Sequence, residues 1–432
     1  MSDQKTTILE VLQQQFKELE GQMNGTTNSA GHLARKSAFA SFKKIGLPNR
    51  RNEEYKYTPF ASQLEKHFES FVANPEAAES AINHSQLPDL NGSMLVFVNG
   101  NYHQELSNVI REDGLGIQIA TSQNELMKHT SSTLSSTDAY SGLNLALATT
   151  GVKIIVEKSA VIKEPINIVH LTNSNRGRVL STLRHEIIIG ENAQATVSEI
   201  FIGDGKHSSF TNSSMEVSVG AYGILNHYKV GIDDDNDLRI DNTTCRQQNN
   251  SVLNTINVNY GGKIVRNNLN VIIEGEYCET NLAGLYIPAA HGNIDNHTIV
   301  DHTVPNCNSN ELYKGILGDY ATGVFNGKVF VRQHAQKTNA FQSNKNILLA
   351  DTATINTKPQ LEIWADDVKC SHGCTTGQMD KEQLFYLRTR GIDITSARKL
   401  LLKAFAEEVI EKFKDHKLRA RVAAILEEKL AV

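Results

Sequence analysis

The sequence predicts a mainly β protein, a parallel β-helix core between two helical regions, and two observations support this fold class. The spacing of apolar residues changes from helical to alternating near residue 93 and returns to helical near residue 378. Within the alternating part, apolar runs end in corners of small residues, as in IIIGENAQATV, VSVGAYGIL and LLADTATI. Such corners are typical of coils that stack on one another and bury a continuous apolar column.

Residues 1–92 are predicted to form an N-terminal helical region followed by a connection. ILEVLQQQFKELE and HLARKSAFASFKKIG place apolar residues at helical spacing, and the polar stretch GQMNGTTNSAG separates them. The first twenty residues lack the basic start and the uninterrupted apolar run of an export signal. Residues 73–92 are polar and are expected to connect this region to the core.

Residues 93–377 are predicted to form the β-helix core. LVFVNG, HEIIIG, MEVSVG and NLNVIIEG are short runs rich in β-branched residues, and each ends in Gly. An antiparallel sandwich would instead show hairpin turns of the Asn-Gly type. Helical patterns are almost absent over these residues.

Residues 378–432 are predicted to form a C-terminal helical region. The apolar residues of TSARKLLLKAFAEEVIEKF share one stripe: Leu401, Leu402, Phe405, Val409 and Phe413. Thr395 or Ser396 is expected to cap this helix. The segment LRARVAAILEEKLAV adds a second amphipathic helix.

Composition excludes several classes of protein. The 43 basic and 48 acidic residues give a net charge of -5 without a sustained basic stripe, so nucleic acid is not expected as a partner. No apolar run is long enough to span a membrane. Five scattered cysteines in 432 residues are too sparse for a disulfide framework and indicate free thiols in a reducing cytoplasm.

Three apparent motifs lack a residue or a spacing that their function requires. The acidic run at 233–237 imitates a calcium loop, but Leu238 and Thr244 stand where Gly and Glu are required. GVFNGK lacks the spacing of a phosphate-binding loop, so we expect this chain to bind no nucleotide. His297 and His302 are separated by an odd number of positions and should face opposite sides of one strand.

The stretch CSHGCTTGQ, residues 370–378, is the strongest candidate site. Thiolate and imidazole are the usual ligands of soft and borderline metals, including iron–sulfur clusters. The stretch can supply two or three ligands, whereas a closed site needs about four. Either other ligands come from elsewhere, including another chain, or Cys370 is a small buried hydrophobe and His372 caps the next helix. Spacing alone favours the second interpretation.

Longer motifs resemble the SufB/SufD family of iron–sulfur cluster assembly proteins. LEIWADDVKCSHGCTTGQMDKEQLFYLRTRGI, residues 361–392, is similar to the family signature. GVFNGKVFVRQHAQKTNAFQSNKNILLADTATINTKPQLEI resembles the family's β-helix, and RRNEEYKYTPF, residues 50–60, resembles an N-terminal motif in which Tyr55 replaces a common tryptophan. Cys-Ser-His-Gly followed by Phe-Tyr-Leu resembles the SufD branch, because SufB shows Cys-Glu-His-Glu and Phe-Tyr-Cys.

The resemblance implies a right-handed β-helix scaffold that is not itself catalytic. It implies pairing with SufB through the β-helix and with the ATPase SufC through the C-terminal helices, so that ATP hydrolysis takes place in SufC and clusters pass to apoproteins. An isolated chain would be able to form a homodimer.

The family's functional Cys-x-His pair maps onto Cys370 and His372. This implies iron or a transient iron–sulfur cluster at the interface with SufB. Cys374 stands where alanine is usual and is interpreted as a spare thiol.

Two alternatives stay open. A SufB-like subunit would itself hold the nascent cluster. A β-helix enzyme acting on polysaccharide would carry an export signal and clustered carboxylates or basic residues on one face, and neither stands out.

Overall fold

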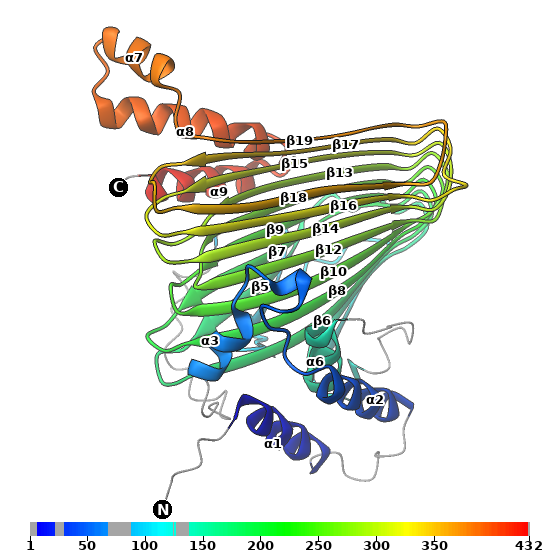
Figure 1. Cartoon of the computed structure of the whole chain (residues 1–432). Coiled ribbons are helices and arrows are strands. Elements are labelled where there is room, and N and C mark those ends of the chain that lie inside the picture. Colours follow the sequence, from blue (N-terminus) through cyan, green and yellow to red (C-terminus); the bar gives the residue numbers. More distant parts are fainter. Residues whose placement is uncertain (1–6, 22–29, 68–87, 124, 127–137, 431–432) are drawn as a thin grey trace, which may run out of the picture.

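A computed structural model describes residues 7–21, 30–67, 88–123, 125–126 and 138–430. Its central feature is a parallel β-solenoid in which successive strands alternate between two sheets (Figure 1). Sheet A contains β1 (Ser93–Val98), β2 (Asn101–Tyr102), β5 (Ile166–Asn173), β7 (Gln194–Asp204), β9 (Ile224–Asp233), β11 (Val252–Gly261), β13 (Glu279–Ile287), β15 (Asn308–Leu317), β17 (Asn339–Leu348) and β19 (Lys369–Gly377). Sheet B contains β3 (Leu115–Ala120), β4 (Gly151–Val156), β6 (Val179–Ile189), β8 (Ser209–Val219), β10 (Asp237–Gln247), β12 (Ile264–Ile273), β14 (Asn293–His302), β16 (Thr322–Val331) and β18 (Thr354–Ile363).

Neighbouring strands within each sheet are parallel and in register from β5 and β4 onward. The antiparallel pairs β1–β2 and β3–β4 lie at the first end of the stack. In-register stacking places equivalent residues of successive coils above one another, so the interior consists of columns of side chains. The predicted fold class, a parallel β-helix with helices at both ends, is confirmed.

The corners explain the small-residue pattern in the sequence. At one corner, successive coils turn at residues with positive φ: Asn192, Tyr222, Asn250, Tyr277, Asn306 and Lys337. Five of these six residues donate their backbone N–H to the next coil, as when the Tyr222 N–H donates to the Asn249 carbonyl at 2.8 Å. Asn, which enters the left-handed region more readily than most residues, occupies three of these six corners, and Tyr or Lys occupies the other three.

The N-terminal helices cover the early coils of sheet B (Figure 1). They are α1 (Ile8–Gly21), α2 (Ala30–Ile45), the 3₁₀ turn η1 (Glu53–Tyr55), α3 (Phe60–His67) and α6 (Ala139–Leu147). Helix α6 lies within the range predicted to be β-structure. Its sequence AYSGLNLAL is almost entirely buried, so it has no polar face to reveal a helical period. Of the expected connection at 73–92, residues 73–87 lie outside the described part of the chain.

Residues of the motif RRNEEYKYTPF contact side chains of sheet B and thereby hold the N-terminal region against it. The Arg266 guanidinium lies 3.9 Å from the centroid of the Tyr55 ring and donates to the Glu54 carbonyl at 2.6 Å. The Glu54 carboxylate accepts from Lys328 at 2.6 Å. Tyr55 thus takes part in a cation–π contact and donates its hydroxyl to Asp138 at 2.6 Å.

Two C-terminal helices pack on the outer face of sheet A, and a third stands away from it (Figure 1). They are α7 (Lys381–Thr389), α8 (Ile394–Ile410) and α9 (His416–Lys429). Leu402, Val409 and Phe413 of the predicted stripe are buried in this contact. Asp393 caps α8 by accepting from the backbone N–H groups of Thr395 and Ser396, so neither of those residues is the cap.

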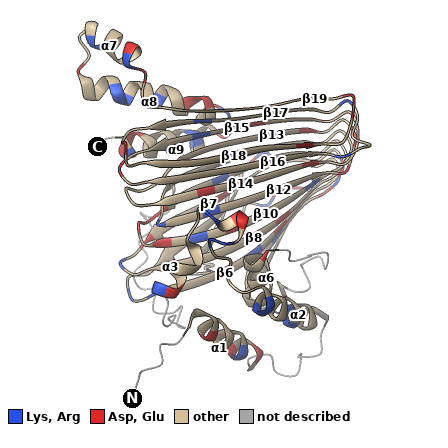
Figure 2. Ribbon diagram, viewed as in Figure 1, with Lys and Arg blue, Asp and Glu red and all other residues tan. Residues whose placement is uncertain are grey.

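Charges of both signs are interspersed over the face in view, without a continuous basic stripe (Figure 2). Among the described residues, no helix combines the length and apolar character needed to cross a membrane.

Candidate site at the open end of the solenoid

The solenoid ends in two open strands, β18 and β19. Among the described residues, β18 is paired with β16 and β19 with β17, and each has no strand on its other side. Both strands are far more exposed than the interior ones. Their outward N–H and C=O groups are available to another chain.

Strand β19 carries the candidate residues on one face. Cys370, His372 and Cys374 pair in register with Ala340, Gln342 and Asn344 of β17. These three β17 residues are buried and point into the interior of the solenoid. Because side chains alternate along a strand, Cys370, His372 and Cys374 lie on the same interior-facing side, at the open end.

Cys370 is half-buried in a small apolar cluster. It packs against a group formed by Val329, Val331, Ala335, Ala340 and Ala365. Burial raises the pKa of the Cys370 thiol above its usual value. A metal ion or a base would therefore be needed to remove its proton near neutral pH. His372 and Cys374 are exposed.

Spacing along the strand decides which of these residues can act together. A strand rises about 3.3 Å per residue, so the Cα atoms of Cys370 and His372 are about 7 Å apart and those of Cys370 and Cys374 about 13 Å apart. Zn–S and Zn–N bonds are about 2.0–2.3 Å long, so two ligand atoms of one such ion lie about 4 Å apart. Cys370 and His372 can converge on one ion, whereas Cys370 and Cys374 cannot. The Cys374 sulfur instead lies 3.4 Å from the Thr357 hydroxyl of β18.

The predicted pair therefore supplies two ligands at most. The site is open toward the end of the solenoid, where the structure offers a strand edge for a second chain. The pair that lacks further ligands therefore lies at the same end of the solenoid as the unpaired strand edge.

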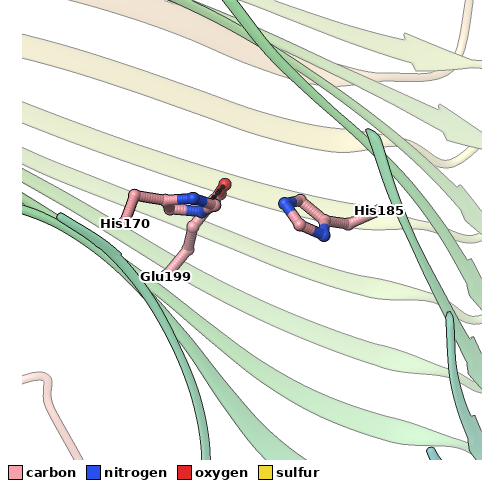
Figure 3. Close-up of side chains that lie close together, drawn as sticks. All are labelled: His170, His185 and Glu199. Atoms are coloured by element: carbon pink, nitrogen blue, oxygen red, sulfur yellow. Dashed lines mark hydrogen bonds and ion pairs between the residues drawn. The ribbon is translucent and has the colours of Figure 1, made fainter. Parts of the chain in front are cut away.

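A second group of potential ligands lies deep in the first coils, and no sequence motif points to it. His170 of β5, His185 of β6 and Glu199 of β7 are buried and have ligand atoms within 4.8 Å of one another (Figure 3). They are far apart in sequence, so only the packing of two sheets brings them together. His170 lies 3.1 Å from Glu199, and the Lys229 ammonium lies 3.2 Å from the other Glu199 oxygen.

Hydrogen bonding shows that this buried group does not fit a metal ion. The Val152 N–H donates to Nδ1 of His185 at 3.1 Å. A neutral ring then carries its proton on Nε2, the nitrogen that faces Glu199 in Figure 3. Metal-bound histidines have the opposite arrangement, because they donate from the second nitrogen to an acceptor. Burial lowers the pKa of His185 to about 3, so the ring is neutral.

The buried group is part of an internal charged network. Burial alone would raise the pKa of Glu199, but Lys229 and His170 hold it well below its usual value. Lys229 also lies 2.5 Å from Asp241, which pairs with Arg239 at 2.6 Å. Paired and hydrogen-bonded charges of this kind are what a buried location requires.

The other three cysteines lie inside the solenoid, away from the candidate site. Cys245, Cys278 and Cys307 are buried, and none of the five cysteines forms a disulfide in the described structure. The thiols of Cys278 and Cys307 both donate to the Gly275 carbonyl, at 3.1 and 3.3 Å.

Comparison with known proteins supports the resemblance seen in the motifs. The profile described as "SUF system FeS cluster assembly, SufBD core domain" matches residues 170–405, and "SufBD protein N-terminal region" matches residues 6–168. The iron–sulfur cluster assembly protein SufD of Escherichia coli is 31% identical over 90% of both chains. An iron–sulfur cluster assembly SufBD family protein of Synechocystis is 31% identical over 93% of this chain and 92% of its own.

A plant protein extends the set of relatives. The chloroplastic protein ABCI7 of Arabidopsis thaliana is 33% identical over 62% of this chain and 58% of its own. The similarity to a protein named SufD favours the SufD interpretation over the SufB-like alternative. With two profiles covering most of its length, the chain belongs to the SufBD family of SUF-system iron–sulfur cluster assembly proteins.

Proposed function

We propose that this chain is a non-catalytic scaffold subunit whose open end pairs with SufB and contributes Cys370 and His372 to a shared site for iron or a transient iron–sulfur cluster. The observation that carries this proposal is the position of both residues on the interior face of an edge strand. Two ligands from one chain need about two from a second chain.

The composition of the edge supports pairing with another chain. Natural edge strands are commonly protected by charged residues or covered by other elements. The sequence of β19, KCSHGCTTG, holds one charged residue, Lys369, at its start. On β18, Ile363 is 40% exposed and the adjacent Trp364 is 48% exposed. The weakly protected edge of β19 and the exposed Ile363 and Trp364 support an interface with SufB at this end of the solenoid.

Helix α7 and the start of α8 form the proposed docking surface for the ATPase SufC. Helix α7 buries none of its residues, and Phe385 and Tyr386 are 68% and 56% exposed. Exposed aromatic residues on a projecting helix are favoured anchors for a partner. We assign ATP hydrolysis to SufC, because the sequence contains no phosphate-binding motif.

The site of action that we propose is the cytoplasm. Five cysteines without a disulfide among the described residues suit a reducing compartment.

The experiment that tests this function is purification of the complex with SufB and SufC under anaerobic conditions. We expect His372→Ala to leave the complex intact and to reduce its iron and sulfide content sharply. The space beside the neighbouring Gly373 is open, with no atom of a non-adjacent residue within 4 Å of the place a Cβ would take, so the strand does not depend on tight packing here. Wild-type iron and sulfide in this variant would show that the Cys-x-His pair is only structural.

A further inference from the structure

One interior column leads directly to His372. The in-register pairs Glu311↔Gln342 and Gln342↔His372 place these residues on three consecutive strands of sheet A, namely β15, β17 and β19. Adjacent strands lie about 4.8 Å apart, so each side chain is within reach of the next. Glu311 and Gln342 are 6% and 3% exposed, respectively. The exposed imidazole therefore stands on top of a buried amide and a buried carboxyl group.

The buried part of this column is held in one orientation. The Gln342 Nε2 donates to Glu311 Oε2 at 2.6 Å. Burial raises the pKa of Glu311 to about 7, and in either protonation state one of its oxygens can accept this hydrogen bond. Across the interior, Gly327 of β16 makes room for the amide, because a Cβ there would lie 2.2 Å from Gln342 Nε2.

The amide oxygen of Gln342 is left without a partner. Gln342 Oε1 is buried and has no hydrogen-bond partner among the described residues. Because Nε2 is committed to Glu311, the oxygen is turned away from that carboxyl group. A buried acceptor without a donor is costly and calls for an explanation. The next residue of the column, on the side away from Glu311, is His372.

We propose that Gln342, anchored by Glu311, is a positioning residue that accepts a hydrogen bond from one ring nitrogen of His372 in the assembled complex. This inference rests on the proposed function, in which His372 binds iron or a cluster. A ligating imidazole donates its second N–H to a neighbouring acceptor, which fixes the tautomer and the direction of the ring. Gln342 supplies that acceptor, so the other nitrogen of His372 is kept free of its proton and directed at the open end.

The test compares Gln342→Met with Gln247→Met in the full complex with SufB and SufC. Methionine keeps the length of glutamine and removes its hydrogen bonds. Gln247 is an equally buried amide in β10, bonded to Ser251 and Thr280, and lies outside the column. We expect Gln342→Met to weaken the binding of ferrous iron about 10- to 100-fold, as is typical when such an acceptor is removed. Gln247→Met should bind iron as the wild type does.

A spectroscopic readout separates positioning from a structural effect. In the complex with SufB and SufC in which only this chain carries ¹⁵N-histidine, the ring signals of His372 are those missing from the complex of His372→Ala. Loss of one hydrogen bond should shift the ratio of its two neutral tautomers about fivefold in Gln342→Met. If Gln342→Met fails to assemble with SufB and SufC, Glu311→Met is the second variant, because it removes the anchor and keeps the Gln342 amide. It should give a smaller loss of iron binding and a smaller change in the His372 tautomer ratio.

The outcomes distinguish this inference from the proposed function. If His372→Ala loses iron while Gln342→Met matches the wild type in either readout, the positioning role is overturned and the proposed function stands. Equal losses in Gln247→Met and Gln342→Met would also overturn it. If His372→Ala retains its iron, the proposed function itself is wrong.

Discussion

Cys370 and Cys374 differ in what surrounds their sulfur atoms, although both lie on the same face of β19. Cys370 is half-buried against apolar side chains, and burial raises its pKa. Cys374 is exposed and contacts Thr357 of the opposite sheet. Because these two cysteines are too far apart to bind one ion, only one of them can share a single ion with His372.

We therefore predict different results for the two alanine variants. Cys370→Ala should lower the iron and sulfide content of the co-purified complex, because it removes one ligand of the proposed shared site. Cys374→Ala should leave that content close to wild type. Acid-labile sulfide and iron determined on both complexes will decide between them. A loss of iron and sulfide in Cys374→Ala alone would place the site two residues downstream of His372.

Buried histidine should make the protein sensitive to acid. His185 has a pKa of about 3 in the folded chain, because burial disfavours its charged form. An unfolded histidine has a pKa of about 6.5, so the unfolded state binds an extra proton below that pH. The stability contributed by the neutral ring is complete above about pH 6.5 and is lost as the pH falls toward about 3.

The test is urea unfolding of the wild type and His185→Gln at a series of pH values. One proton corresponds to a slope of about 1.4 kcal/mol per pH unit. The free energy of unfolding of His185→Gln should fall less steeply than that of wild type between pH 6 and 4, by up to this amount. Parallel curves for the two proteins would contradict the assignment of a neutral buried ring.

The sequence identifies some of these residues and misses others for physical reasons. Cys370 and His372 are close together on one strand, so a local motif is enough to single them out. Gln342 precedes His372 by thirty residues, and their proximity depends on the register of β17 and β19. The group of His170, His185 and Glu199 depends in the same way on the packing of two sheets. A single sequence does not reveal either register or packing.

Among the elements, β18 offers the clearest test of pairing at the open end. The Trp364 N–H donates to the Val331 carbonyl of β16 at 2.9 Å. Alternate residues of a parallel strand direct their N–H groups to opposite neighbours, so the preceding residue, Ile363, directs its N–H outward. Pro359 lies four residues before Ile363 on the same strand, so its backbone nitrogen also faces outward. An edge strand tolerates proline at such a position.

We predict that Ile363→Pro weakens the complex with SufB while leaving the β16–β18 ladder intact. Proline removes one outward donor and stiffens the edge. Size-exclusion chromatography of the mixed subunits gives the fraction of complex. Ile363→Ala is the matched control, because it removes the side chain and keeps the N–H. An unchanged complex in Ile363→Pro would place the interface elsewhere.

Among the secondary-structure elements, the sequence predicts the strands more reliably than the helices. Alternating apolar residues and small corners identify the coils because the strands bury their interior side chains and several corners turn at positive φ. Helix α6 shows no helical period because it is apolar all round. The cap of α8 lies earlier than the sequence predicts, since Asp393 and the following Thr395 and Ser396 are all common capping residues.

Over the whole molecule, the C-terminal helices divide into an attached part and a projecting part. Helices α8 and α9 bury an apolar cluster that includes Tyr228, Val258 and Tyr260 of sheet A. Removing them would expose that cluster to water, so truncation is a poor test of docking. Helix α7 buries none of its residues and can be altered without disturbing the solenoid.

We predict that Phe385→Ala combined with Tyr386→Ala reduces binding of SufC by about 30-fold or more, because a single aromatic anchor often contributes about 2 kcal/mol. The double variant should still pair with SufB. Tyr222→Ala is the control, since Tyr222 is equally exposed, at 56%, but lies at a corner of the solenoid. Titration of SufC monitored by calorimetry measures the effect. Wild-type affinity in the double variant would exclude α7 as the anchor.

In the proposed function, this chain provides only part of a cluster site, which a partner completes at the open end of the solenoid. The most direct measurement is the iron and sulfide retained after anaerobic reconstitution by the isolated chain and by its complex with SufB. We predict that the isolated chain retains little of either and that the complex retains a cluster only when His372 is present. A stable cluster on the isolated chain would contradict the shared site and would favour a subunit that holds the nascent cluster by itself.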